Sequence, residues 1–118
     1  MPKTLPELDV SGPLDGCSIA SGALRGEAAL HVALRLKALA DPVRILIVSM
    51  LLAAGDAGGC TCDLAPAVGL SEATVSHHLR QLREAGFVVG TRDGANVRYR
   101  AQPLALSALC RAIDPDCC

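Results

Sequence analysis

The chain has 118 residues, the usual length of one domain, and 51% of them are hydrophobic although Phe87 and Tyr99 are the only aromatic residues. A formal net charge of −1 excludes a polybasic nucleic-acid binder, and no apolar run approaches the ~20 residues that a membrane span needs. The N-terminus "MPKTLPELDV" lacks the apolar core of a secretory signal, so we expect a cytoplasmic protein without a membrane partner. In that reducing compartment the six cysteines are expected to bind metal or sense redox state rather than to form structural disulfides.

The N-terminal part divides into an arm and a first helix. Residues 1–20 hold three of the seven prolines and show no sustained periodicity, so they predict a mobile arm. Helical patterning begins near residues 21–27 and runs through "LHVALRLKALA". Its apolar stripe holds Leu30, Ala33, Leu34 and Lys37, and Leu36, Leu39 and Ala40 widen it. A helix apolar on so much of its circumference is expected to be buried, in part against the second chain of a homodimer.

Two helices are predicted next. In "ADPVRILIVSMLLAAG", Asp41 can cap a helix and Pro42 suits its first position. The apolar run through Ile45, Leu46, Val48, Leu51 and Leu52 predicts a core helix that ends at Gly55. A short helix over residues 63–68 follows, with Asp63 as its cap, because Pro66 needs a place in the first turn. Cys60 and Cys62 would then lie just before or at the start of this helix.

A two-faced helix comes after a tight turn at Gly69 and Leu70. Ser71 caps it, and Gly86 ends it. Its inward stripe holds Val75, Leu79 and Leu82, and Ala73, Ser76, His77 and Arg80 lie on the opposite side. His78 falls toward the inward side, where packing or hydrogen bonding is its expected role.

The C-terminal part is predicted as a hairpin and a last helix. "FVVGT" and "NVRYRAQ" are expected strands around "RDGA", where Asp93-Gly94 is typical of a hairpin turn. Arg98 and Arg100 alternate with Val97 and Tyr99, so one face of the hairpin is basic. Pro103 begins a helix that runs to Ile113, with Leu106, Leu109 and Ile113 on one side. A Cys-rich tail, residues 114–118, ends the chain.

This order of elements predicts a mainly α fold with a small β-hairpin wing, a winged helix-turn-helix domain over residues 21–113. Short polar side chains near the start of the second helix of such a unit can enter a DNA major groove, and arginines can reach phosphates. Residues 71–100 hold five Arg against three acidic residues. The candidate DNA contacts are Ser71, Thr74, Ser76, His77, His78, Arg80 and Arg83 in the helix, and Arg92, Arg98 and Arg100 in the wing. The alternative is a helical hairpin with a merely solvated face.

Three segments carry a resemblance to a known family. "ALADPVRILIVSML", "CTCDLAPAVGLSEATVSHHLRQLREAGFV" and "GANVRYRA" are similar to the ArsR/SmtB family of metal-responsive repressors, and the likeness covers about residues 30–102. The resemblance implies a homodimeric winged-helix protein that binds double-stranded operator DNA until a metal or metalloid releases it. The family pattern carries onto Ser71, Thr74, Ser76, His77, His78 and Arg80 in the recognition helix.

The thiols of Cys60 and Cys62 match the Cys-x-Cys-Asp element of that family. Residues two apart in a regular helix point ~200° from each other, but at a helix start preceded by glycines both thiols can turn inward. A helix N-terminus also favours the thiolate, and thiolates select soft ions. We therefore expect arsenite or antimonite as inducer, or alternatively cadmium, lead or mercury, and no organic cofactor. The context of Cys17, "GCSIASGAL", resembles the arm that brings a cysteine to the partner's Cys-x-Cys, which implies Cys17 as the third ligand.

Other sites and functions remain open at the level of sequence. Cys110, Cys117 and Cys118 form an alternative metalloid triad near the last helix. An enzyme is disfavoured, because no cysteine has the Cys-x5-Arg spacing of thiol-based arsenate reductases and phosphatases and no Cys-x-x-Cys pair is present. A repressor of the same fold that senses oxidants or persulfide through its thiols is the closer rival. An architectural DNA binder with idle cysteines is a third possibility.

Overall fold

The structure is a computed structural model that describes residues 19, 25–114 and 116 of the chain. Cys17, most of the predicted arm, and the tail cysteines Cys117 and Cys118 lie outside the described residues. The elements, in chain order, are α1 (Gly26–Leu39), α2 (Pro42–Ala54), the short 3-10 helix η2 (Gly55–Ala57), α3 (Thr61–Val68), α4 (Glu72–Glu84), β1 (Val88–Asp93), β2 (Asn96–Ala101) and α5 (Pro103–Ile113).

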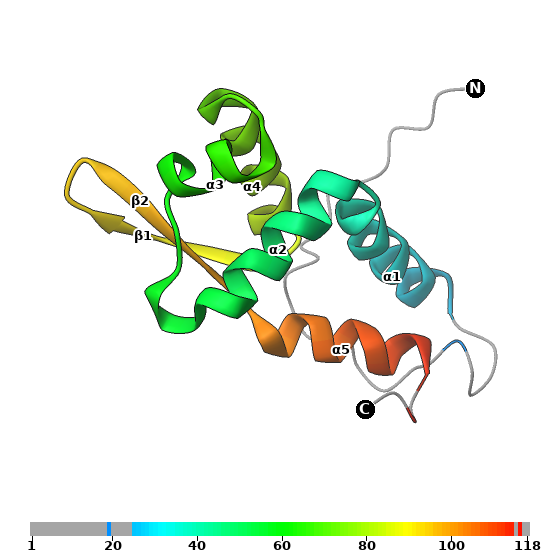
Figure 1. The fold of residues 1–118 in the computed structure, drawn as a ribbon. Helices are drawn as coiled ribbons and strands as arrows, with labels where there is room; N and C mark the ends of the chain where they lie inside the picture. Colours follow the sequence, from blue (N-terminus) through cyan, green and yellow to red (C-terminus); the bar gives the residue numbers. More distant parts are fainter. Residues whose placement is uncertain (1–18, 20–24, 115, 117–118) are drawn as a thin grey trace, which may run out of the picture.

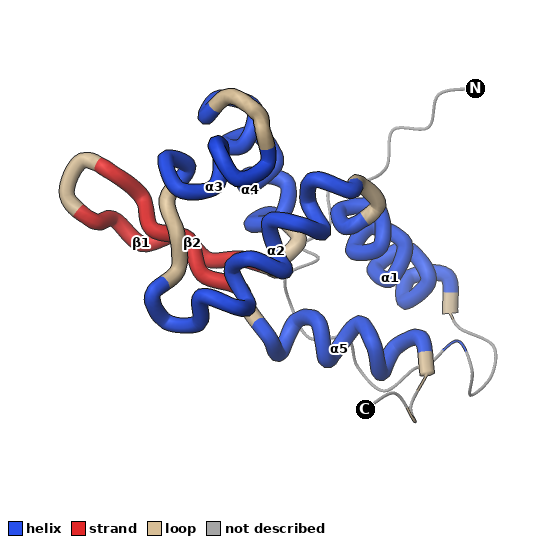
Figure 2. Tube along the Cα trace, viewed as in Figure 1, coloured by secondary structure: helices blue, strands red, loops and turns tan. Residues whose placement is uncertain are grey.

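The elements surround α2, which crosses the middle of the molecule (Figures 1 and 2). The α3–α4 pair lies on one side of α2, and the β1–β2 hairpin projects away from the molecule. Helix α5 begins at the base of the hairpin and runs back to lie beside α1. The two strands are antiparallel, with Val88 opposite Ala101 and Asp93 opposite Asn96, so Gly94 and Ala95 form the turn. Gly94 has a φ of 64°, the left-handed conformation that such a two-residue turn requires.

The start of α2 is formed as the sequence predicts. The carboxylate of Asp41 accepts hydrogen bonds from the backbone amides of Val43 at 2.8 Å and Arg44 at 3.4 Å. Pro42 occupies the first helical position, where its missing amide proton costs nothing, and the chain leaves the helix at Gly55 with a φ of 60°. Desolvation raises the pKa of Asp41, but the two amide hydrogen bonds and the charge of Arg44 outweigh it and hold that pKa below its usual value.

The core is mainly aliphatic and is centred between α2, α4 and the base of the hairpin. The predicted inward stripe of α4 is confirmed, because Val75, Leu79 and Leu82 are fully buried. Ile47 and Phe87 are equally buried and belong to the same cluster. This packing fixes which face of α4 points outward, and it therefore positions the candidate DNA-reading side chains.

Two predictions about burial in the first helices are wrong. In α1 the buried residues are Val32 and Arg35, whereas Ala33 and Lys37 of the predicted stripe are exposed. In α2, Val48 and Leu51 are buried as predicted, but Ile45 and Leu46 are 54% and 53% exposed and Leu52 is 39% exposed. Both helices are apolar on most of their circumference, so the pattern does not determine which side faces the core.

The start of α3 also differs from the prediction. The helix begins at Thr61 with Cys60 as its N-cap, so Asp63 lies at the third helical position rather than at the cap. Pro66 consequently lies inside the helix, beyond its first turn. The eight-residue helix ends at Gly69, whose φ of 72° provides the left-handed turn into α4.

Within the described part of the chain, no single helix is long and apolar enough to cross a membrane. The pair formed by Gly26–Leu39 and Pro42–Ala57 reaches that length and composition together, but it is bent by 86°.

Candidate DNA interface and thiol site

The recognition helix α4 has one free face. The hydroxyl of Ser71 accepts a hydrogen bond from the Thr74 amide at 3.2 Å and donates one to the Thr74 hydroxyl at 3.0 Å, which caps the helix as predicted. Ser76, His77 and Arg80 are exposed on the side opposite the buried stripe. Arg83 is also exposed, near the end of α4. The sequence therefore places short polar groups at the start of this face and cations further along it, the arrangement that a major groove and its phosphates accept.

His78 differs from its exposed neighbour His77. It is half-buried, and its Nδ1 lies 3.3 Å from Nη1 of Arg44 on α2. The Nε of Arg44 in turn donates to the carbonyl of Ala38 at 2.6 Å. The expected inward packing of His78 agrees with this contact, which ties the recognition helix to α2 and to the end of α1.

The three wing arginines are not equivalent. Arg92 is exposed, and its side chain makes no hydrogen bond or ion pair with any described residue. Arg98 binds the carboxylate of Asp93 at 3.2 Å and donates to the carbonyl of Ala57 at 2.9 Å. Arg100 donates to the hydroxyl of Thr91 at 3.2 Å. These side chains, with Asp56, line a shallow pocket of about 330 Å³ on the wing.

Cys60 and Cys62 come together at the start of α3. Cys60 is only 5% exposed, Cys62 is exposed, and their Cα atoms are 5.1 Å apart. The two sulfurs are bonded as a disulfide, contrary to the expectation for a reducing compartment. The extended backbone of Cys60, with φ of −95° and ψ of 171°, breaks the helical spacing and lets thiols two residues apart point to the same place.

Asp63 completes this cluster in a way that the sequence analysis missed. The Cys60 amide donates to its carboxylate at 3.2 Å, and its own amide donates to the Cys60 sulfur at 3.2 Å. This reciprocal pair is a capping box, which the three-residue spacing between Cys60 and Asp63 could have indicated. In the part of the chain that the structure describes, Cys60, Cys62 and Asp63 form the one group of three metal-ligating side chains, with ligand atoms within 4.8 Å of one another.

The thiol segment lies between the recognition helix and the wing. The hydroxyl of Thr61, between the two cysteines, donates to the carboxylate of Glu72 at the start of α4 at 2.9 Å. Gly59, just before Cys60, is paired with Tyr99 of β2 by two backbone hydrogen bonds of 2.9 and 2.8 Å. The thiol segment is therefore hydrogen-bonded directly to α4 and to β2, the two candidate DNA-contacting elements.

The alternative triad is only partly described. Cys110 lies on α5 and is half-buried, whereas Cys117 and Cys118 lie outside the described residues. The same holds for Cys17, the third member of the first triad. The geometry of neither complete triad is therefore part of the structure.

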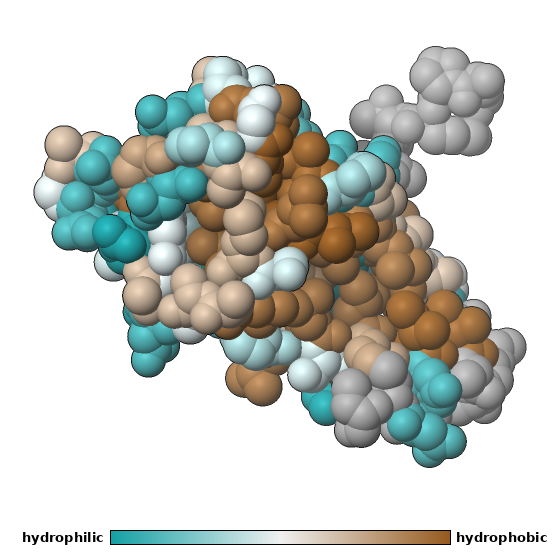
Figure 3. Space-filling view, viewed as in Figure 1, coloured by the Kyte–Doolittle hydropathy of each residue, from teal (hydrophilic) through white to brown (hydrophobic). Residues whose placement is uncertain are grey.

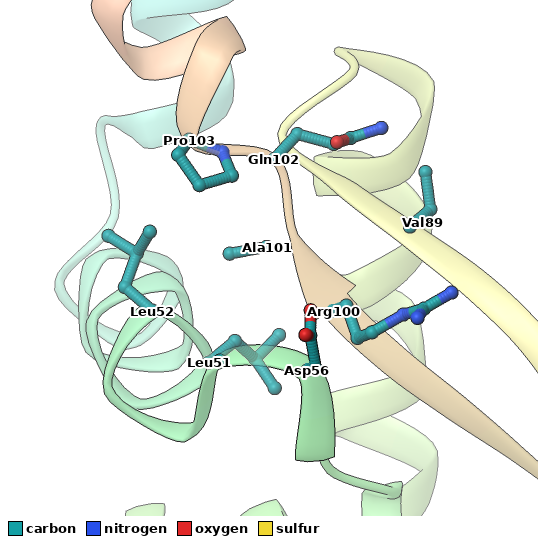
Figure 4. A pocket seen from close by; sticks show the side chains of 9 residues that line it. Leu51, Leu52, Asp56, Val89, Arg100, Ala101, Gln102 and Pro103 are labelled. Atoms are coloured by element: carbon teal, nitrogen blue, oxygen red, sulfur yellow. The ribbon is translucent and has the colours of Figure 1, made fainter.

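A pocket of about 400 Å³ lies where the end of α2 meets the junction of β2 and α5 (Figure 4). Leu51 and Leu52 of α2 face Ala101 and Pro103 across it, and Asp56 and Arg100 contribute its charged groups. Val89, Arg100 and Ala101 of the wing strands also line the pocket, but none of the described cysteines does.

Comparison with known proteins identifies the fold and the class of protein that the sequence predicts. The family model described as "Bacterial regulatory protein, arsR family" matches residues 41–89. The HTH-type transcriptional regulator NmtR of Mycobacterium tuberculosis is 40% identical over 86 residues, which cover 73% of this chain and 69% of NmtR. The arsenical resistance operon repressor of Escherichia coli is 40% identical over 67 residues, 57% of this chain and 56% of that protein, so the chain spans little more than half of that relative.

Among solved structures, the AntR antimony-specific transcriptional repressor superposes with a TM-score of 0.64 at 31% sequence identity. The superposition covers 80% of this chain and 88% of AntR. Together with the five helices and the antiparallel hairpin, it confirms the predicted winged helix-turn-helix fold.

Proposed function

Because this chain belongs to the arsR family of bacterial regulatory proteins, we propose that it is a repressor released from operator DNA by arsenite or antimonite bound to its thiols. The family consists of metal-responsive, DNA-binding transcriptional repressors and not of enzymes. The inducer, the ligand residues and the homodimer are our proposals.

The observation that carries the proposal is the meeting of Cys60 and Cys62 at the start of α3. When reduced, the pair offers two soft sulfur donors, and soft donors favour arsenite, antimonite, cadmium, lead or mercury over hard cations. Cys60 is also the N-cap of α3, so the positive end of the helix dipole favours its thiolate. A trivalent metalloid accepts three thiolates, and we assign the third to Cys17 of the partner subunit.

We assign DNA contact to the exposed face of α4 and to the wing. The proposed contacts are Ser71, Thr74, Ser76, His77, Arg80 and Arg83 in and before α4, and Arg92 and Arg100 in the wing. His78 and Arg98 are left out of this set, because the ring of His78 contacts Arg44 and the guanidinium of Arg98 already binds Asp93 and the carbonyl of Ala57.

The homodimer is supported by apolar side chains that a single chain leaves exposed. Leu36 of α1 is 40% exposed, Leu104 of α5 is 80% exposed and Ile113 of α5 is 40% exposed. Hydrophobic residues gather over the middle of the molecule and toward the α1 and α5 end (Figure 3). A second copy would cover this surface, and two recognition helices would then meet successive half-sites on DNA.

The testing experiment is an arsenite titration of the complex between the reduced protein and operator DNA selected from a random library, followed by fluorescence anisotropy. Cys60→Ser and Cys62→Ser should fold and bind the operator, because neither residue lies on the DNA-facing side of α4, but arsenite should no longer release them. A hydroxyl is a poor ligand for a soft centre. Cys17→Ser should weaken the response less, because the arm pays an ordering cost on binding.

The control is a variant in which Cys110, Cys117 and Cys118 are all serine, and it should respond as the wild type does. If this control loses the response and Cys60→Ser keeps it, the sensor is the C-terminal triad instead.

A thiol redox switch is the second candidate, because the structure joins Cys60 and Cys62 as a disulfide. In that state neither sulfur is available as a thiolate ligand. An oxidant or persulfide would then release the DNA in the absence of metal, and excess reductant would reverse the release. Release by arsenite that persists in excess monothiol reductant supports metalloid sensing over this candidate.

A further inference from the structure

The segment that leads into the thiol site is clamped to the wing. Five residues make this contact, and we call them the wing bracket: Ala57, Gly58 and Gly59 before the thiols, and Arg98 and Tyr99 of β2. Its backbone part is the pair of hydrogen bonds between Gly59 and Tyr99, at 2.9 and 2.8 Å. Its side-chain part is the hydrogen bond of 2.9 Å from Arg98 to the carbonyl of Ala57. Cys60 follows Gly59 directly, so the first thiol is one residue away from a fixed contact with β2.

Gly58 shows how closely the two segments approach each other. Its φ is +59°, and a Cβ at this position would collide with the carbonyl oxygen of Tyr99 and lie 2.9 Å from Cγ of Arg100. The same Cβ would lie 3.2 Å from Cγ of Arg98. Only glycine therefore allows the backbone before the thiols to lie against β2, between the stems of two arginines.

The guanidinium of Arg98 is held from both sides. Its Nε lies 3.2 Å from the Asp93 carboxylate in the wing, and its Nη1 binds the carbonyl of Ala57, 41 residues earlier in the chain. Arg92, on the neighbouring strand, has no such contact within the described residues and is exposed. The Arg98 side chain is 41% exposed, but its guanidinium already has two partners within the chain, whereas Arg92 remains available to another molecule.

We propose that Arg98 is a positioning residue that couples the thiol site to the wing, and not a DNA contact. The proposal rests on the proposed function, in which ligand binding at Cys60 changes DNA affinity. When Cys60 and Cys62 close around a ligand, Gly59 moves with Cys60. The hydrogen bonds to Tyr99 and Arg98 then transmit this movement to β2, which tilts the wing away from the DNA backbone.

The test compares Arg98→Met with Arg92→Met, since methionine keeps an apolar stem and removes the charge and all N–H donors. For each reduced protein, operator affinity is measured with and without sodium arsenite over a range of salt concentrations. Arg98→Met should keep the wild-type salt slope. It should also still bind arsenite, which is measured as protection of its thiols from a thiol dye. Arsenite should nevertheless lower its operator affinity several-fold less than it lowers that of the wild type, for which ~5–150-fold is typical of allosteric proteins.

Arg92→Met should behave in the opposite way. Its salt slope should fall by about 1, because one phosphate contact is lost, while the affinity ratio with and without arsenite stays at the wild-type value. If Arg98→Met instead loses salt slope and keeps the wild-type ratio, Arg98 is a DNA contact and the proposal is wrong. If arsenite does not release the wild type, the proposed function fails, and that result is separate from any comparison of variants.

A second variant guards against a folding defect. Asp93→Asn keeps the backbone of the turn and weakens only one side of the hold on Arg98, so it should reduce the arsenite response less than Arg98→Met and leave the thermal midpoint near that of the wild type. An unchanged arsenite response in both variants, with normal folding, would overturn the proposal.

Discussion

At the scale of single residues, the candidate DNA interface depends on which arginines are free. Arg80 is exposed on α4, on the side opposite the fully buried Leu79. Its side chain makes no contact with the described residues that would compete with a phosphate. Arg98 carries the same charge, but its guanidinium is already engaged by Asp93 and Ala57.

Arg80→Ala is therefore expected to weaken operator binding. If Arg80 contacts a phosphate, the loss should be similar for all DNA sequences, and the salt slope of log affinity should shrink by about 1. Fluorescence anisotropy at several salt concentrations, with operator and scrambled DNA, measures both quantities. Wild-type affinity in a folded Arg80→Ala protein would reject this orientation of the helix.

The same scale shows what the sequence could not reveal about the site. The proximity of Cys60 and Cys62 and the cap at Ser71 follow from local spacing, so they are predictable, whereas the disulfide between the two cysteines is not. The contact from Arg98 to the carbonyl of Ala57 joins residues 41 positions apart and leaves no local pattern. The position of Pro66 favours Asp63 as the cap, whereas Asp63 lies at the third helical position and pairs with Cys60.

At the scale of elements, α4 has one face that packs into the core and an opposite face that we propose contacts DNA. Leu79 is fully buried between Val75 and Leu82, whereas Ser76 is exposed. The clear alternation of apolar and polar residues in α4 made this division predictable. In α1 and α2, where apolar residues occur on nearly all sides, the pattern gave the helices but not their buried faces.

Leu79→Ala should lower the free energy of unfolding by about 2–5 kcal/mol, because it leaves a cavity in a core that has few large side chains. Ser76→Ala, its matched control on the other face, should leave stability nearly unchanged and affect operator affinity instead. Urea unfolding followed by circular dichroism, together with anisotropy, separates the two effects. A loss of stability in Ser76→Ala as large as that in Leu79→Ala would contradict this division.

At the scale of the whole molecule, the exposed apolar residues of α1 and α5 support the homodimer that we propose. Leu104 is 80% exposed at the start of α5, beside the pocket that Pro103 lines. Leu70, in the turn between α3 and α4, is 37% exposed and belongs to a different part of the surface. If a second copy covers the α1 and α5 end, only the first of these leucines is buried by assembly.

Leu104→Glu is accordingly expected to weaken the dimer, since it would place a charge in an apolar interface, and Leu70→Glu should leave the dimer intact. Sedimentation velocity over a range of protein concentrations measures the dissociation constant of each. Equal dissociation constants for wild type and Leu104→Glu would remove α5 from the interface. Because a monomer presents one recognition helix, operator affinity should fall together with dimerisation.

The unequal exposure of the two thiols implies an order of events. Cys62 is exposed and Cys60 is only 5% exposed, so in the proposed function an arriving metalloid would meet Cys62 first and the shielded sulfur second. Dissociation of the metalloid would follow the reverse order, because a competing cellular thiol could begin the exchange only at the bond to the exposed Cys62 sulfur. After a short exposure, the inducer would then dissociate from the Cys62 sulfur before the Cys60 sulfur had reacted. Only a sustained supply would reach the buried sulfur, so the proposed sensor would respond to its inducer with a delay.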